Sequence, residues 1–437
     1  MRIDHAYVGQ RDSLSTYRGG ALMPTLAADL HPDTVRAAFP ALARTDAQGR
    51  SVVYADAPGG TQVPQRVIDA MVDYLVEHNS NIEGEFDATR ETDAIIARAR
   101  DAAATFVGGD ADEIAFGHNM TSLNFNLTRA FGRGLKAGDE IIVTQLDHEA
   151  NVSPWLLLAA DRDLVVRTIG LTEDLDIDLA ALTSAIGPRT KVVAHTLSSN
   201  AVGTIPPARQ IADLAHAAGA AVWVDAVAYA PHLRIDVKDL DCDVLLCSPY
   251  KFFGPHLGMA WVRRDFAEGL AAERVRPASL HPIGHRFETG TLSHEAMAGT
   301  TAAINYLASI GEGDSLKDQL DSAYRKIRVH ETALAERFLA GLADIRGVRL
   351  LGTRDLERRV CTFGLQMHSA DPASAARALN DDGIYSWNGN FYAQGVMEHL
   401  GLPMEEGILR VGFVHYATPG EIDRVLAALH GIAEGAQ

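Results

Sequence analysis

A lysine that directly follows an apolar stretch is the first residue whose surroundings indicate chemistry. Lys251 lies in the segment 247–258, CSPYKFFGPHLG, between Tyr250 and Phe252. Ligands bind at the carboxyl ends of strands in α/β sheets. Partial desolvation at such a place lowers the pKa of a lysine and makes its amine nucleophilic. A lone lysine is more often an ordinary surface residue, but this flanking motif favours a reactive amine.

Two other polar side chains follow apolar stretches of the same kind. Asp225 ends the stretch AVWVD, and His148 lies in the segment DHEAN shortly after the stretch EIIV. A carboxylate at the carboxyl end of a strand can pair with a protonated pyridine nitrogen, although the same residue type also caps helices. The His148 imidazole could stack on a flat ring. The alternative is that His148 is an ordinary loop residue held by hydrogen bonds.

A phosphate-binding signal precedes a helical pattern that begins near residue 120. Backbone N–H groups and hydroxyls at the start of a helix suit a phosphate. Pyridoxal 5′-phosphate (PLP) requires four groups of a protein: an amine, a carboxylate, a group that stacks on its ring, and a binding site for its phosphate. We therefore predict that PLP is held as an imine on Lys251. The segment that would hold the phosphate consists of Asn119, Met120, Thr121 and Ser122.

Alternating strand-like and helical stretches must position these residues. Short apolar, β-branched stretches predict strands, and the patterns between them predict helices. Because the strands are apolar on both faces, we expect a mostly parallel sheet with helices on each side. The predicted strands are 140–143, 164–169, 191–195, 221–224 and 244–247, and the clearest helices between them are 179–186 and 207–218.

The pattern of predicted elements changes near residue 300, where the alternation of strands and helices ends. A long helical pattern over 302–342 is followed by strand-like and helical stretches that predict a smaller α+β domain. We expect three parts: an arm over residues 1–35 that packs on the small domain, a large PLP-binding domain over 36–300, and the small domain over 301–437.

Composition excludes several other classes of protein. The formal net charge is −18, without a block of Lys and Arg, which argues against nucleic-acid and membrane partners. The three cysteines, at 242, 247 and 361, form no disulfide framework and complete no metal site. No stretch has the length and apolarity of a membrane span. The expectation is a cytoplasmic protein without a metal.

Five segments resemble the aminotransferase class V enzymes of PLP fold type I, and more narrowly the cysteine desulfurase-like branch. The likeness runs from about residue 51 to near the C-terminus, so it covers most of the chain. It implies a seven-stranded-type sheet in the large domain and a homodimer with shared active sites. The segments are 197–204 (LSSNAVGT), 224–232 (VDAVAYAPH), 248–255 (SPYKFFGP), 286–291 (RFETGT) and 409–413 (LRVGF).

The resemblance also implies a role for each matching position. Lys251 would form the imine, Asp225 would pair with the pyridine nitrogen and His148 would stack over the ring. Arg410 would bind the substrate carboxylate, because a guanidinium can donate two parallel hydrogen bonds to a carboxylate. The alternative is that Arg410 forms an ordinary surface ion pair. The other implied contacts are Thr121, Ser248, Tyr250 and, from a second subunit, Thr291 for the phosphate, and Asn200 beside the ring hydroxyl and the substrate.

The sequence differs from the desulfurase pattern in the segment that carries the catalytic cysteine of those enzymes. Desulfurases place a sulfur-accepting cysteine on a loop before the last strands, but residues 383–393 read GIYSWNGNFYA, and Tyr392 occupies the place of that cysteine. Trp387 replaces an arginine near the substrate. We therefore predict that the protein is not a conventional sulfur-donating desulfurase. These aromatic side chains either line a substrate pocket or pack under a loop.

Two further departures concern the cofactor. Ala228 replaces the glutamine that contacts the ring hydroxyl in the family, and Tyr250 replaces the histidine before the lysine. The electronic tuning of the cofactor is therefore expected to differ.

Three functions remain open at this point. The first is a β-eliminating lyase that cleaves the C–S or C–Se bond of a cysteine-like amino acid, in which Lys251 removes the α-proton. The second is a class V aminotransferase or an amino-acid epimerase, and the third is a PLP-binding scaffold without catalysis. Retention of Lys251, Asp225, His148 and Arg410 argues against the scaffold.

Overall fold

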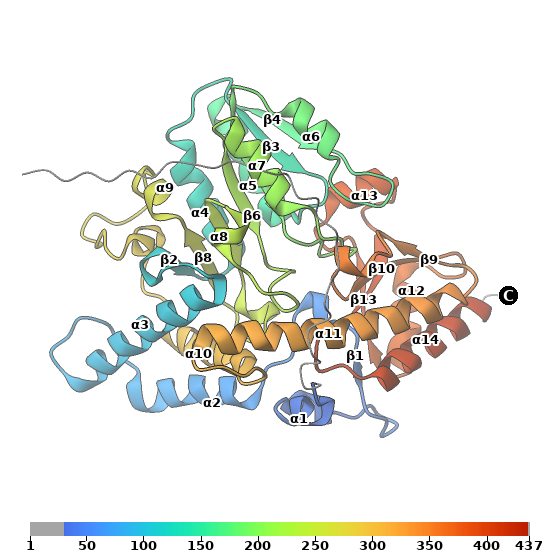
Figure 1. The fold of residues 1–437 in the computed structure, drawn as a ribbon. Coiled ribbons are helices and arrows are strands. Elements are labelled where there is room, and N and C mark those ends of the chain that lie inside the picture. Colours follow the sequence, from blue (N-terminus) through green and yellow to red (C-terminus); the bar gives the residue numbers. More distant parts are fainter. Residues whose placement is uncertain (1–29, 436–437) are drawn as a thin grey trace, which may run out of the picture.

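Two sheets organise the computed structural model, which describes residues 30–435 (Figure 1). The larger sheet has seven strands in the order β2-β8-β7-β6-β5-β3-β4. All neighbouring strands in it are parallel except those that pair with β8. The strands are β2 (Ile114–Gly117), β3 (Glu140–Thr144), β4 (Val165–Ile169), β5 (Thr190–Thr196), β6 (Ala221–Asp225), β7 (Val244–Cys247) and β8 (Gly258–Val262).

Helices cover both faces of the larger sheet because its central strands are apolar on both sides. In β6, Ala221 and Trp223 pack on one face, and Val222 and Val224 pack on the other. The first face carries α4 (Met120–Gly132), α5 (Ser153–Arg162) and α9 (Arg264–Glu268). The second carries α3 (Asp87–Val107), α6 (Leu179–Ala185), α7 (Ala208–Ala217), α8 (Val237–Leu240), α10 (His294–Ala308) and the first half of α11 (Leu316–Ala343).

The smaller sheet has four antiparallel strands in the order β12-β13-β10-β9. They are β9 (Val348–Leu351), β10 (Thr362–Met367), β12 (Trp387–Gly389) and β13 (Ile408–Gly412). The second half of α11 packs against this sheet together with α12 (Pro372–Asp381) and α14 (Pro419–Glu434). Figure 1 shows α11 running along both bodies, so one long helix joins the two sheets.

The remaining elements are a two-stranded pair, short helices and single turns. β1 (Val53–Tyr54) pairs in parallel with β11 (Ile384–Tyr385). The other helices are α1 (Pro32–Ala37), α2 (Gln65–Asp73), which continues as a π-helical turn, η3 (Tyr74–His78), and α13 (Gln394–Leu400). Single 3₁₀ turns are η1 (Pro40–Ala43), η2 (Ala57–Gly59), η4 (Ala111–Glu113), η5 (Glu149–Asn151), η6 (Pro249–Lys251), η7 (Ile283–Phe287) and η8 (Leu356–Arg358).

The predicted fold class is confirmed: a mostly parallel seven-stranded sheet is flanked by helices, and a smaller α+β body follows. The single long helix predicted over 302–342 is wrong, because α10 and α11 are separate helices. Gly313 has φ 151° between them, and a side chain on Gly311 would place Cβ 2.0 Å from the Gln319 carbonyl oxygen. Ser315 then caps α11. Strands β1, β2, β8, β11 and β12 were not predicted.

The predicted division into domains stays a prediction. Its boundary at residue 300 falls inside α10, and most of the predicted arm, residues 1–29, lies outside the described residues. Just after the arm, Arg36 binds Glu421 of α14 at 3.0 Å. Within residues 30–435, no helix has both the length and the apolarity needed to cross a membrane.

Candidate active site

A cavity of about 660 Å³ lies at the carboxyl edge of the larger sheet and is closed on one side by the smaller sheet. Every predicted site residue lines it except Ser122 and Thr291, which are exposed and lie outside it. The lining residues are Gly59, Asn119, Met120, Thr121, Phe125, His148, Glu149, Ala150, Ser153, Thr196, Ser198, Asn200, Asp225, Val227, Ala228, Ser248, Tyr250, Lys251, Trp387, Phe391, Tyr392 and Arg410.

The strand order explains why the cavity lies there. From β3 the chain passes outward to β4, and then returns to β5 on the other side of β3 before it continues through β6 and β7. Such a reversal leaves a crevice at the carboxyl ends of the two diverging strands. His148 follows β3, Asn200 follows β5, Asp225 ends β6 and Lys251 closes the turn after β7. Residues distant in sequence therefore converge.

Lys251 is held at the floor of the cavity as a partly desolvated amine. Its Nζ donates a hydrogen bond to the Pro58 carbonyl oxygen and lies 5.0 Å from the centroid of the Tyr250 ring. The pKa of the amine is lowered from 10.5 to about 7, chiefly by burial and also by the charge of Arg410, against the opposing effect of Asp225. An amine with this pKa is neutral, and hence nucleophilic, above about pH 7.

Asp225 presents a buried carboxylate, 4% exposed, at the end of β6. Within the described residues the side-chain carboxylate receives one hydrogen bond, from the Val227 backbone N–H at 2.8 Å. Burial raises its pKa from 3.8 to about 6, against the effects of that bond and of Lys251. No helix begins at Asp225, so the alternative role as a helix cap is wrong; the following helix, α8, is capped by Asp236.

His148 lines the cavity in a fixed orientation. Its Nδ1 accepts a hydrogen bond from the Ala150 backbone N–H at 2.9 Å, which leaves the proton of the neutral ring on Nε2. Burial lowers the pKa of the ring to about 4, with contributions from Lys251 and Arg410. The neutral imidazole is therefore the form present near neutral pH.

A buried polar network supports the His148 loop from below. The Asp147 carboxylate accepts hydrogen bonds from the Thr144 hydroxyl and, at 2.8 Å, from Asn151. Asn124 donates to Asn151 at 3.2 Å and accepts from the Trp223 indole at 2.8 Å. The network joins β3, α4 and β6, so the backbone of the loop is tied to the sheet.

The N-terminus of α4 faces the cavity and was predicted to hold a phosphate. The Asn119 side chain caps the helix by accepting from the Ser122 N–H at 2.8 Å. A side chain on Gly258 of β8 would place Cβ 2.3 Å from the Asn119 carbonyl carbon and 2.8 Å from the Met120 nitrogen. Only glycine at 258 allows this helix end to approach the sheet so closely.

Arg410 binds across the gap between the two sheets. It is 4% exposed, donates to the Asn200 carbonyl oxygen at 2.8 Å, and its guanidinium carbon lies 3.8 Å from the centroid of the Phe391 ring. Burial lowers its pKa to about 9, against the effects of Tyr250 and Asp56. The alternative of a plain surface ion pair is wrong, because this guanidinium is buried.

Two consecutive residues of the segment 383–393 adopt left-handed backbone. Phe391 has φ 56° and Tyr392 has φ 54°, a conformation that costs roughly 1–2 kcal/mol per L-residue. Asn200 donates to the Phe391 carbonyl oxygen at 2.9 Å, and the Glu149 N–H donates to the Tyr392 carbonyl oxygen at 2.7 Å. Two residues that follow strands of the larger sheet thus hold the carbonyl groups of this strained pair.

Polar atoms without a partner in this cavity test whether it fits PLP. Ser198 Oγ, Asn200 Oδ1 and Arg410 Nε are buried and have no hydrogen-bond partner among the described residues. Buried polar atoms are rarely left so unless a ligand or water satisfies them. Together with the amine of Lys251, the carboxylate of Asp225 and the first turn of α4, they suit a flat, phosphorylated, protonatable ring.

Sequence reasoning missed several residues that line the cavity, among them Phe125, Glu149 and Ser198. Phe125 lies four residues after Thr121, so helical spacing places both side chains on one face of α4. Glu149 and Ser198 stand beside predicted site residues, within the motifs DHEAN and LSSNAVGT. Gly59, where no functional side chain exists, gave no such signal.

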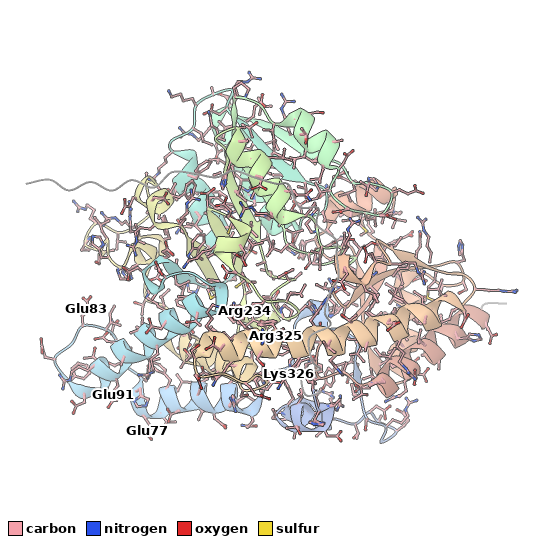
Figure 2. All side chains as sticks on the ribbon, in the orientation of Figure 1. Glu77, Glu83, Glu91, Arg234, Arg325 and Lys326 are labelled. Atoms are coloured by element: carbon pink, nitrogen blue, oxygen red, sulfur yellow. The ribbon has the colours of Figure 1, made fainter. Side chains whose placement is uncertain are left out.

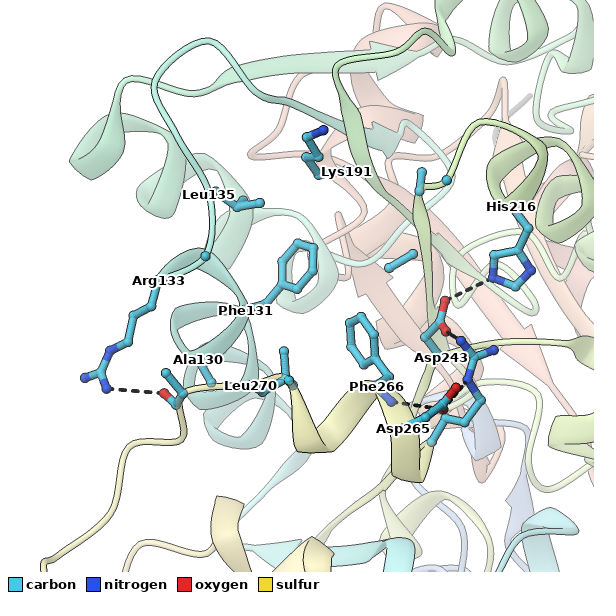
Figure 3. Close-up of a pocket in the computed structure, with 17 residues that line it drawn as sticks. Ala130, Phe131, Arg133, Leu135, Lys191, His216, Asp243, Asp265, Phe266 and Leu270 are labelled. Atoms are coloured by element: carbon cyan, nitrogen blue, oxygen red, sulfur yellow. Dashed lines mark hydrogen bonds and ion pairs between the residues drawn. The ribbon is translucent and has the colours of Figure 1, made fainter.

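A second cavity, of about 780 Å³, lies at the opposite edge of the larger sheet (Figure 3). Its central carboxylate, Asp243, pairs with Arg263, accepts from the Val222 N–H at 2.7 Å and contacts His216 at 3.0 Å. Since these charges satisfy one another and none of the predicted site residues lies here, we place the candidate site in the smaller cavity.

Known proteins match nearly the whole chain. The sequence profile of the family described as Aminotransferase class-V matches residues 53–425. A probable cysteine desulfurase of Streptomyces coelicolor is 32% identical, over 92% of this chain and 97% of that protein. A probable cysteine desulfurase 1 of Mycobacterium leprae is 33% identical, and this chain spans 65% of its length. The apo structure of a cysteine desulfurase from Thermococcus onnurineus NA1 superposes with a TM-score of 0.83 at 26% identity, over 94% of this chain and 100% of that one.

Proposed function

Because the chain belongs to the aminotransferase class-V family, whose members use PLP, and is cysteine desulfurase-like over most of its length, we propose that it is a β-eliminating lyase. Its substrate is a cysteine-like amino acid whose C–S or C–Se bond breaks. One observation carries the proposal: Lys251, Asp225 and Arg410 converge on a cavity that no cysteine lines. All three cysteines are free and at most 2% exposed, so none is placed to accept sulfur.

Residues of the larger sheet would hold the cofactor. Lys251 would bind it covalently through the amine, Asp225 would keep the pyridine nitrogen protonated, and His148 would stack on the ring. The first turn of α4 and Ser248 would hold the phosphate. When bound, PLP supplies an electron sink that weakens the bonds at the α-carbon of an amino acid.

The chain's own groups would then select elimination. Arg410, with Asn200 beside it, binds the substrate carboxylate and so fixes the orientation of the α-carbon. The Lys251 amine, neutral above about pH 7, accepts the α-proton. The sulfur fragment leaves with the electron pair of the C–S bond and takes up a proton. It departs to solvent as sulfide or thiol, since the cavity offers no thiolate to receive it.

The test combines absorbance with product analysis. We expect the purified protein, saturated with PLP, to show a visible band that shifts when L-cysteine is added, and to release sulfide, ammonia and pyruvate in equal amounts. L-alanine, which has no β leaving group, is the matched control. A keto acid with bleaching towards the pyridoxamine form would instead establish transamination, and inversion of the α-carbon alone would establish epimerisation. Absence of turnover with any amino acid would leave a PLP-binding scaffold.

We also propose a homodimer that forms through an exposed apolar surface. Ile68, Val72, Leu75 and Val76 lie on one face of α2 and η3 and are 40–69% exposed; we call them the α2 surface. Their spacing is that of a helix face that packs on a partner. Carboxylates, including Glu77, Glu83 and Glu91, project around this end of the molecule (Figure 2) and give the surface the polar rim of an interface.

The site itself supports this arrangement. A neighbouring cavity, lined by Ile68, Gly59, Tyr250 and Trp387, runs from the α2 surface to the wall of the candidate site. A partner seated there would reach that wall, where Thr291 of the second subunit is expected to contact the phosphate. The buried, free thiols agree with a reducing compartment such as the cytoplasm, which we propose as its location.

Charges on the α2 surface are expected to separate the subunits. The double variant Val72→Glu, Leu75→Glu should elute as a monomer in size-exclusion chromatography with light scattering, whereas the unaltered protein should elute as a dimer. The reason is that dimerisation would bury the two new glutamates of one subunit against those of the other. Val329→Glu on α11, an exposed apolar position (63% exposed) that is not part of the α2 surface, is the matched control and should stay dimeric. A monomeric unaltered protein with full activity would refute the proposal.

A further inference from the structure

Aromatic side chains form the outer wall of the candidate site, and the proposed roles leave them without a use. Phe125, Trp387, Phe391 and Tyr392 all line the cavity. Trp387 is 47% exposed and Tyr392 is 69% exposed, which places them among the exposed large apolar side chains of the described residues. Aromatic surface at the mouth of a pocket is the usual means of binding an apolar part of a ligand.

Trp387 lies beside the residue that would bind the substrate carboxylate, Arg410. It pairs directly with Arg410 across β12 and β13, so both side chains project from the same face of the smaller sheet. The indole lies against the backbone of Gly59, where any Cβ would come within 2.2 Å of its Nε1. A substrate whose carboxylate is bound by Arg410 therefore lies beside the indole.

Phe391 and Tyr392 complete the wall and are fixed in place. The Phe391 ring covers the Arg410 guanidinium at 3.8 Å. The Tyr392 ring lies 5.5 Å from that of His148, centroid to centroid, and its backbone N–H donates to Asn390 at 2.9 Å. Because the left-handed backbone of both residues is held by Asn200 and Glu149, these rings form a preorganised surface.

We infer that the substrate is an S-substituted L-cysteine that carries an apolar aryl or alkyl group on sulfur. Cysteine itself ends at its thiol and would leave the aromatic wall in water, whereas a thioether substituent would cover it. This inference rests on the proposed elimination and names its substrate class. The residue at the position of the desulfurase cysteine, Tyr392, would then contact the substituent instead of receiving sulfur.

The reaction balances without an oxidant or reductant. The α-proton passes to Lys251, the Cβ–S bond breaks, and its electron pair leaves on sulfur, which takes up a proton to give the thiol. The remaining three-carbon enamine takes up water. Overall, one S-substituted cysteine and one water give one thiol, one pyruvate and one ammonium ion. The thiol leaves through the open mouth of the cavity.

The first test compares two substrates in the PLP-loaded protein. We expect kcat/KM for S-benzyl-L-cysteine to exceed that for L-cysteine at least tenfold, measured as pyruvate release. Trp387→Ala should lower this ratio at least tenfold, and Trp387→Phe, which keeps an aromatic ring, should lower it less. A ratio of one or below, or a ratio that neither Trp387→Ala nor Tyr392→Ala changes, would overturn the inference.

A binding experiment separates this inference from the proposed function. S-benzyl-α-methyl-L-cysteine has no α-proton and so does not react. Of the four tryptophans, Trp155, Trp223 and Trp261 are at most 4% exposed, so Trp387 is the one that a ligand can reach. The analogue should quench tryptophan fluorescence saturably in the unaltered protein and not in Trp387→Phe. Quenching without pyruvate from any cysteine derivative would retain the binding site and refute the lyase. Pyruvate without quenching would retain the lyase and refute this inference.

Discussion

Replacing Lys251 with alanine is expected to lower kcat/KM for β-elimination by about a thousandfold or more and to remove the visible band of the lysine-bound cofactor. The loss combines the covalent link with the base that accepts the α-proton, a role that contributes about 10²–10⁴-fold in enzymes. Steady-state pyruvate release and absorbance spectra of the same preparations measure both effects. Lys251→Arg keeps the positive charge without a nucleophilic amine and should be as inactive as the alanine variant.

The pH dependence of cofactor binding provides an internal check on that result. Burial lowers the pKa of Lys251 to about 7, so the amine becomes neutral, and able to attack the PLP aldehyde, as the pH rises through 7. The rate at which cofactor-free protein regains its band should therefore rise between about pH 6 and 8 and then level off. A midpoint near the ordinary lysine value of 10.5 would show that the amine is not desolvated, and activity in Lys251→Ala would remove this residue from the mechanism.

Asp225→Asn is expected to stabilise the cofactor-free protein while it lowers kcat/KM by about a hundredfold or more. The asparagine can still accept the Val227 hydrogen bond, but a neutral amide does not hold a proton on the pyridine nitrogen. Breaking a buried charge pair of this kind costs about 3–5 kcal/mol, and each 1.4 kcal/mol is a factor of ten in rate. Pyruvate assays of the PLP-saturated variant measure the loss.

The stabilisation follows from the raised pKa of Asp225. The carboxylate is charged above about pH 6 in the folded chain but already above its ordinary value of 3.8 in the unfolded chain. Folding near pH 7 therefore carries an unfavourable contribution, roughly 1–3 kcal/mol, that is absent below pH 3.8. Asp225→Asn should raise the Tm of the cofactor-free protein at pH 7. A lower Tm, or a rate close to that of the unaltered protein, would contradict the assignment.

The sequence predicted the central strands of the larger sheet well, because those strands are apolar and polar residues stand at or after their ends. Asp225 ends β6 and Lys251 closes the turn after β7, so the pattern located both the strand ends and the side chains that line the crevice. β8 was missed since Gly258 opens it inside a motif that already suggested a ligand-binding turn. The break between α10 and α11 carried local signals, two glycines and the Ser315 cap, that the long helical pattern outweighed.

The geometry of the aromatic wall that the smaller sheet contributes to the cavity could not be predicted from local sequence patterns. Left-handed backbone at Phe391 and Tyr392 runs against the preference of both residue types and depends on hydrogen bonds from Asn200 and Glu149, which are far away in sequence. The burial of Arg410 under a phenyl ring likewise depends on how the two sheets meet. The predicted roles of the individual site residues await the variants described above.

The division of the cavity between two sheets has an evolutionary consequence. The groups that would handle the proton and the cofactor descend from the larger sheet, whereas Trp387, Phe391 and Tyr392 come from one short segment of the smaller one. Side-chain substitutions in that segment can therefore change which amino acid is accepted while Lys251 and Asp225 stay in place on the larger sheet. Relatives that differ in this segment but retain Lys251 and Asp225 should have inherited the same chemistry and acquired different substrate specificities.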